Sequence, residues 1–204
     1  MTSPAAQGSL ALRLKTETAP LHDKLDKLVM SLKPFDTREN YGRFVVAQYL
    51  FQRDIESLYD DQAYAALIPD LATRPRLAAA HADLDDLGVA VPATDETPRG
   101  EGMELPEGLG WLYVSEGSKL GAAFLFKEAG QKLGLDENFG ARNLAAPADG
   151  RGAAWKRFVQ ALDGSGLSTA EQDRVVAGAS AAFERFAVLL SRSYDLKDEP
   201  SLAA

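Results

Sequence analysis

The fold is decided by the stretch Glu107-Gly108-Leu109-Gly110-Trp111-Leu112-Tyr113-Val114-Ser115-Glu116-Gly117-Ser118-Lys119-Leu120-Gly121-Ala122-Ala123-Phe124-Leu125-Phe126. Its apolar residues recur at helical spacing, which predicts one helix over about 105–133. Gly117 and Gly121 share one face of that helix, although each glycine costs a helix roughly 1 kcal/mol relative to alanine. Together with Ser118 and Ala122 they leave a strip of bare backbone, and something must lie close against it.

Two arrangements would explain the bare strip. Glycine lets a second helix approach closely, and small residues spaced by four, taken alone, favour this explanation. The other explanation is a flat ligand that lies directly on the helix backbone. The rest of the chain has to decide between them.

The remaining sequence predicts more helices and no strand of useful length. A first helix is expected from Ser9, and a second from Pro20 with Thr18 as its cap. Thr37 is expected to cap a long helix rich in aromatic residues. Further helices are predicted over 62–67, 75–87, 153–162 and 169–194, with a loop over 88–102. The fold class is therefore all-α, a helical bundle of about seven to nine helices, with one domain over 1–204 and an ordered core of about 9–194.

The composition excludes several kinds of protein. The 204 residues include no cysteine and two histidines, which rules out thiolate and multi-histidine metal sites. A net charge of −8 argues against a nucleic-acid partner. No apolar run is long enough to cross a membrane, and no signal-peptide pattern is present. We therefore expect a cytoplasmic protein that does not bind membranes.

His22 is the first residue that could carry chemistry. The common catalytic motifs are missing: HExxH, Gly-x-Ser-x-Gly, a GxGxxG after a strand, and Glu-x-x-His pairs. His22 lies at the edge of an apolar helix face, where a lone histidine is more often a packing or surface residue. A neutral imidazole at such an edge is also what an axial haem ligand needs. His81 is expected to be solvated. A flat ring held between His22 and the strip at Gly117 and Gly121 fits haem.

Residues 110–126 resemble the distal helix of bacterial haem oxygenases, and residues 12–16 and 21–23 resemble their proximal helix. Residues 139–142 and 149–152, with Trp155, match further segments in the same order, so the resemblance covers about 9–194. It implies a haem-oxygenase-like fold. It also implies that the chain opens haem with molecular oxygen and releases biliverdin, carbon monoxide and ferrous iron, haem being both cofactor and substrate.

The same resemblance implies roles for individual residues. His22 would be the iron ligand. The distal surface that promotes catalysis would comprise Gly117, Ser118 and Gly121, where the close backbone steers bound oxygen toward a meso carbon. Protons would arrive through ordered water. The expected partners of this water are Arg74, Arg142 and Ser118, and the remaining residues expected to contact haem are Lys15, Tyr113, Phe183 and Phe186.

Some positions depart from the family pattern. Asn143 replaces a frequent histidine, and Lys119 stands where asparagine also occurs, so the details of the water network are open. Lys15 and Tyr113 are the expected partners of the haem propionates. Since Glu128 is acidic where some relatives carry a second basic residue, opening at the α carbon is favoured.

The expected electron donor follows from the absence of a cofactor-binding motif for electron transfer in the chain. It has no flavin or nicotinamide motif, so electrons must come from a separate reductase or ferredoxin-type donor. Iron acquisition and supply of a bilin to a photoreceptor are both open, and a monomer is the default. Two alternatives remain: a non-catalytic haem carrier or sensor on the same fold, and a helical bundle that acts on a non-haem small molecule. The distal glycines favour the enzyme, because a storage site does not need so tight a space.

Overall fold

Helices form all the regular structure of the described residues, which are 8–197 and 202 of this computed structural model. The prediction of an all-α fold is therefore confirmed. None of these helices is both long and apolar enough to cross a membrane. The elements, in chain order, are α1 (Leu10–Ser31), α2 (Arg38–Asp60), α3 (Gln62–Leu67), η1 (Leu71–Thr73), α4 (Leu77–Leu87), α5 (Leu105–Leu133), η2 (Arg142–Leu144), α6 (Arg151–Asp163) and α7 (Thr169–Ser193).

Helix α1 is continuous through Pro20, so the prediction of a second helix starting there is wrong. Thr18 is not a cap either: it is buried, and its hydroxyl donates to the carbonyl of Leu14 at 2.8 Å. Ser9 caps the whole helix instead. A proline inside a helix removes a backbone hydrogen bond. Packing of the buried face of α1, which includes Leu14 and Leu25, against α7 outweighs that local cost.

Local caps explain why other helix boundaries agree with those predicted from the sequence. The side chain of Thr37 accepts a hydrogen bond from the backbone of Asn40 at 3.1 Å and starts α2. Ser168 and Glu171 form a reciprocal capping box at the start of α7. Gly134, with a φ of 66°, ends α5 in the left-handed conformation that glycine adopts without strain.

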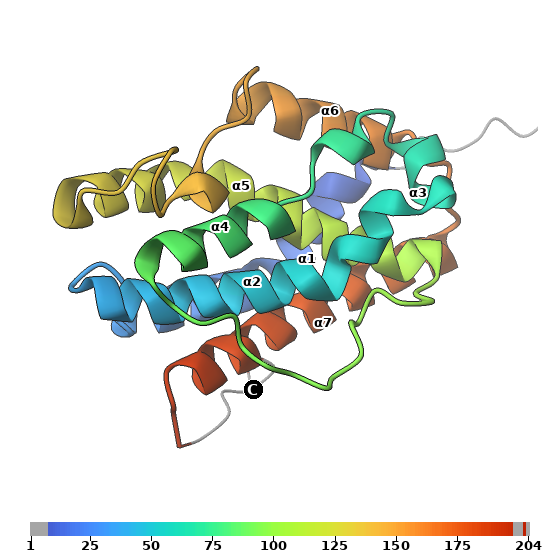
Figure 1. The fold of residues 1–204 in the computed structure, drawn as a ribbon. Coiled ribbons are helices and arrows are strands. Elements are labelled where there is room, and N and C mark those ends of the chain that lie inside the picture. Colours follow the sequence, from blue (N-terminus) through green and yellow to red (C-terminus); the bar gives the residue numbers. More distant parts are fainter. Residues whose placement is uncertain (1–7, 198–201, 203–204) are drawn as a thin grey trace, which may run out of the picture.

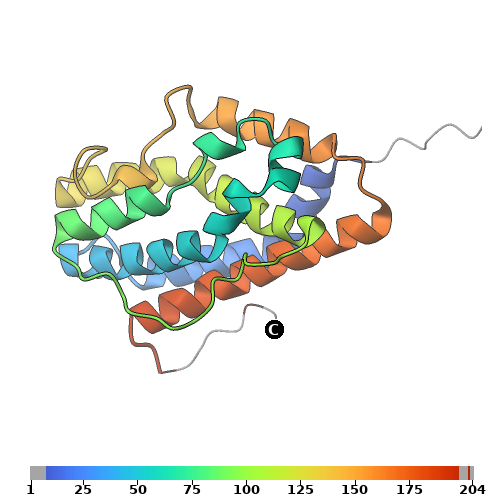
Figure 2. The same ribbon diagram turned by 45° about the vertical axis from the view of Figure 1, so that its right-hand side comes forward.

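Helix α7 is the common neighbour that positions the other long helices. It packs against α1, α2 and α5, whereas α4 covers α2 and α6 covers α5. Figure 1 shows α1, α5 and α7 running in the same direction through the bundle, with α2 running the opposite way. The rotated view in Figure 2 keeps α6 on the outer side of α5 and α7 on the opposite side.

Helices α5 and α7 meet at two glycines. A Cβ atom on Gly110 would overlap the carbonyl oxygen of Val175, and one on Gly178 would overlap that of Glu107. Here the small residues do allow the close helix contact that the sequence analysis considered for Gly117 and Gly121. This contact fixes the height at which α5 passes α7.

We expect Gly110→Ala to lower the free energy of unfolding by about 3 kcal/mol, because an added methyl group must push two packed backbones apart. Urea denaturation followed by circular dichroism measures this. Gly117→Ala is the matched control on the same helix, since its Cβ would lie at an ordinary 3.7 Å from Trp155. Equal stability of the two variants would show that the α5–α7 contact yields easily.

Candidate functional site

His22 projects from α1 next to Phe183 of α7. The two ring centroids are 5.9 Å apart and the rings meet edge to face at 73°. The His22 side chain is 58% exposed, so one side of the imidazole is open. The other histidine, His81, is also exposed, as predicted, and lies on α4 beside Asp85.

Asp26 is a partner of His22 that the sequence analysis missed. The Nδ1 atom of His22 lies 3.2 Å from a carboxylate oxygen of Asp26, one helical turn later. The four-residue spacing was the available signal, because such residues are neighbours on a helix surface. At this distance an Nδ1 hydrogen can be donated to Asp26, and Nε2 is then the nitrogen available to a ligand.

Lys15 lies on the same face of α1 as His22. Seven residues correspond to almost two full turns, so the two positions are about 10 Å apart along the helix. The Lys15 side chain is exposed. An ammonium group here can reach an anionic group of a ligand bound at His22.

On α5, Tyr113, Gly117 and Gly121 form one stripe with a spacing of four. The Tyr113 ring packs on Trp155 of α6 at a centroid distance of 5.6 Å, and burial raises the pKa of its hydroxyl. Further along the stripe, a Cβ on Gly117 would lie at an ordinary 3.7 Å from Trp155, and a Cβ on Gly121 would meet no described atom within 4 Å. Nearby, Leu120 and Phe124 are 42% and 52% exposed. A close helix contact therefore does not explain Gly117 and Gly121.

The α5–α7 contact brings His22 and the glycine stripe to the same end of the bundle. Glu104 pairs with Arg174 before the contact at Gly110 and Gly178, so both helices advance in the same direction. Gly117 lies about 10 Å beyond that contact along α5, and Phe183 lies about 8 Å beyond it along α7. Since His22 contacts Phe183, it shares this level of the bundle with Gly117.

The two predicted aromatic walls have different surroundings. Phe183 is buried and touches His22. Phe186 packs on α2 instead, with ring centroids 6.4 Å from Phe44 and 5.6 Å from Phe51. Phe186 thus packs in the core beneath the site, whereas Phe183 contacts His22, the candidate iron ligand.

The polar residues expected to order water have different hydrogen-bond partners and do not form one group. The hydroxyl of Ser118 donates to the carbonyl of Ser115 at 2.7 Å. Arg142 pairs with Asp86 of α4. The amide oxygens of Gln48 and Gln52, which the sequence analysis did not single out, are buried without a hydrogen-bond partner. Buried acceptors of this kind are normally satisfied by water.

The site has the donor set of a haem protein rather than of a side-chain metal centre. No group of three His, Asp or Glu side chains in the described residues could hold a metal ion. Haem brings four ring nitrogens of its own and needs a single axial side chain, which His22 can supply. Two surface cavities, of about 160 and 500 Å³, are lined by other residues, so the glycine stripe is not a wall of either.

The chain is similar to known proteins over nearly its whole length. The family model described as "Heme oxygenase" matches residues 8–192. "Heme oxygenase PigA" of Pseudomonas aeruginosa is 54% identical over 182 residues, which are 89% of this chain and 91% of that protein.

Solved structures of two further proteins have a similar fold. The heme oxygenase of Neisseria meningitidis, known in NO- and CO-bound crystal structures, superposes with a TM-score of 0.89 at 38% identity, covering 95% of this chain and 96% of that one. The heme oxygenase of Leptospira interrogans has a TM-score of 0.70 at 18% identity, covering 90% and 99%, and shares the fold.

Proposed function

The chain belongs to the haem oxygenase family and is a haem-degrading oxygenase, and from this premise we propose that His22 of α1 and the Gly117–Gly121 stripe of α5 hold the two faces of haem. The observation that carries this proposal is the uncovered stripe. Two glycines weaken α5 although no close helix contact requires them: a Cβ on Gly121 would meet no described atom, and one on Gly117 would have ordinary room beside Trp155. Contact with a flat ligand explains why side chains are absent there.

The chemistry of bound haem defines what the protein has to supply. When bound, haem supplies the iron at which oxygen is reduced and the ring carbon that is oxidised, and the products are biliverdin, carbon monoxide and ferrous iron. The protein binds and orients the ring, leaves space for a small molecule on one face, and holds protons nearby. Each of these tasks has candidate residues in the described structure.

His22 and Asp26 perform the binding task. A histidine whose Nδ1 hydrogen is held by a carboxylate presents Nε2 in a fixed orientation and is a stronger ligand. Both side chains are mostly exposed, so their contact adds little to folding stability. Its value lies in orienting the imidazole.

We expect Asp26→Asn to weaken haem binding by about tenfold, because the imidazole loses its anionic partner. An absorbance titration with hemin measures the affinity. Asp23→Asn is the control, since Asp23 is an exposed carboxylate on the same turn of α1. Equal affinity in the two variants would contradict the role of Asp26.

The glycine stripe performs the steric task. With no side chain at Gly117 or Gly121, a small molecule can fit between haem and the α5 backbone, and its direction is limited by that backbone. Ser118 lies next to the stripe, and the unpaired amide oxygens of Gln48 and Gln52 on α2 can hold water. These groups supply protons through water, since none of them is itself an acid.

Lys15 and Tyr113 orient the ring in its plane. We assign the propionates to the Lys15 ammonium and the Tyr113 hydroxyl. At the far end of the stripe, Glu128 is paired with Lys132 at 2.8 Å, so its charge is neutralised within α5. The cation on the Lys15 side then determines the rotation of the ring and favours opening at the α carbon.

Electrons come from a separate reductase or ferredoxin-type protein, because the chain has no flavin or nicotinamide motif. A carrier or sensor would bind haem through the same His22 but would not consume it. A photoreceptor that accepts the bilin is one destination of the product.

Turnover tests this function. The hemin complex, given ascorbate or a reductase in air, is expected to lose its Soret band while biliverdin absorption rises, and chromatography is expected to find the α isomer. A haem spectrum that persists under these conditions would favour the carrier. Failure to bind hemin would favour a non-haem ligand.

A further inference from the structure

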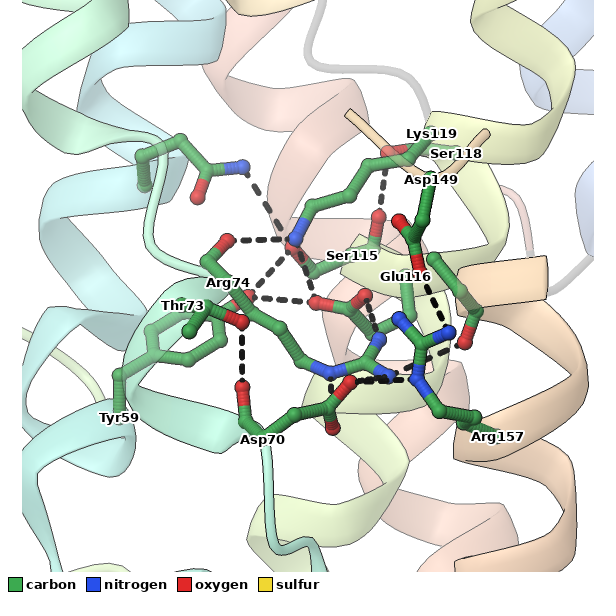
Figure 3. Close-up of polar contacts among 12 residues, drawn as sticks. Tyr59, Asp70, Thr73, Arg74, Ser115, Glu116, Ser118, Lys119, Asp149 and Arg157 are labelled. Atoms are coloured by element: carbon green, nitrogen blue, oxygen red, sulfur yellow. Dashed lines mark hydrogen bonds and ion pairs between the residues drawn. The ribbon is translucent and has the colours of Figure 1, made fainter. Parts of the chain in front are cut away.

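An ion cluster lies along α5, and its central pair, Arg74 and Glu116, is buried. We use this name for Asp70, Arg74, Glu116, Lys119 and Arg157, shown in Figure 3. Arg74 pairs with both carboxylates of the cluster, at 2.9 Å from Asp70 and 2.6 Å from Glu116. Arg157 of α6 adds a second cation to Asp70 at 2.9 Å. The cluster therefore connects α5 with α6 and with the segment around η1.

Glu116 is the member of the ion cluster that α5 buries most deeply, at 4% exposure. Its two carboxylate oxygens are fully engaged. One accepts from Arg74, and the other accepts from Lys119 at 2.5 Å and from the Tyr59 hydroxyl at 3.1 Å. Tyr59 also contacts the hydroxyl of Ser115 at 3.0 Å. A carboxylate in an apolar helix is tolerated here because each oxygen has a donor.

The position of Glu116 on the helix relates the ion cluster to the glycine stripe. Successive residues of a helix are about 100° apart, so Glu116 lies about 100° from Gly117 and about 140° from Gly121 around the axis. The carboxylate thus anchors α5 on one flank of the stripe, about 60° from Tyr113 around the axis. Rotation of α5 would pull Glu116 from Arg74 and from the Tyr59 hydroxyl, which both lie outside α5, and would leave buried charges unpaired, which is costly.

We infer that Glu116 is a positioning residue that fixes the rotation of α5, so that Gly117 and Gly121, and no side chain, face the haem. The contact at Gly110 and Gly178 attaches α5 to α7 about two helical turns before the glycine stripe. The ion cluster supplies the second attachment. This inference rests on the proposed role of the stripe.

The test measures access to the distal face of haem. The ferric hemin complexes of the wild-type protein and of Glu116→Gln are titrated with azide, a small ligand that binds on the side opposite His22. The glutamine keeps the shape but removes the charge. A rotated α5 places side chains over the ring, so we expect azide to bind about fivefold more weakly. Hemin affinity, which depends on His22, is expected to change less than azide affinity.

Asp54→Asn is the matched control. Asp54 and Arg185 form another buried pair, at 2.7 Å, but they connect α2 with α7 and lie outside the ion cluster. Both variants are expected to lower the melting temperature, and only Glu116→Gln is expected to weaken azide binding. Equal azide affinities in the two variants would overturn the inference and leave the proposed function intact.

A milder pair of variants covers the case in which Glu116→Gln does not fold. Tyr59→Phe removes one donor to Glu116, and Tyr64→Phe removes a hydroxyl that donates to the backbone of Met103 and Glu104 instead. Weaker azide binding in Tyr59→Phe alone supports the inference, and equal azide binding in both overturns it. A wild-type protein that binds no hemin would overturn the proposed function, and the inference with it.

Discussion

His22→Ala is expected to abolish nitrogen coordination of haem iron by the protein and to end biliverdin production. No second histidine can take over, because His81 lies on α4 beside Asp85 and Tyr49. Loss of an outer partner of a metal ligand costs roughly 10- to 100-fold, so loss of the ligand itself should cost more. Optical spectra of the hemin complex and the rate of biliverdin formation measure both effects.

His81→Ala is the control for this variant and is expected to behave as wild type. Added imidazole provides a second check, since it can occupy the space left by the His22 ring and restore a nitrogen-coordinated spectrum. An unchanged spectrum in His22→Ala, without imidazole, would remove His22 as the ligand.

Gly121→Val is expected to separate folding from function. The Cβ atom would meet no described neighbour, and valine is no worse than glycine in a helix, so the melting temperature should not fall. The added methyl groups would occupy the space of a small molecule on the distal face of haem. We expect hemin to bind and biliverdin formation to fall at least about tenfold, similar to other losses of positioning in an active site.

Ala123→Val is the matched control for Gly121→Val. It adds a branched side chain to an exposed position of α5 that lies about 160° from Gly121 around the axis. Melting temperature, hemin affinity and product yield should all match the wild type. Wild-type product yield in Gly121→Val would contradict the steric role of the stripe.

Helix boundaries are predicted correctly from the sequence where a nearby proline, glycine or capping residue determines them. The bounds 105–133 and 62–67 agree with α5 and α3, because prolines, glycines and caps end those segments. At Pro20 the local signal is misleading. The start that Pro20 suggests lies inside α1, whose buried face packs on α7 and keeps the helix continuous.

Contacts between distant residues explain what the sequence did not reveal. Gly110 resembles the other glycines of α5 until Gly178, on another helix, is placed against it. Glu116 in an apolar run is explained largely by distant partners, among them Arg74, which lies 42 positions earlier in the chain. By contrast, the spacing of Gly117 and Gly121 and the place of His22 at the edge of an apolar face can be read in the sequence, and the resemblance to haem oxygenases is what suggests a role for them.

A crystal structure of the hemin complex tests the central claim most directly. We predict that Nε2 of His22 is bonded to the iron and that the backbone of Gly117 and Gly121 lies over the opposite face of the ring. Iron bound by another residue, or a haem that does not contact the α5 glycines, would contradict this account.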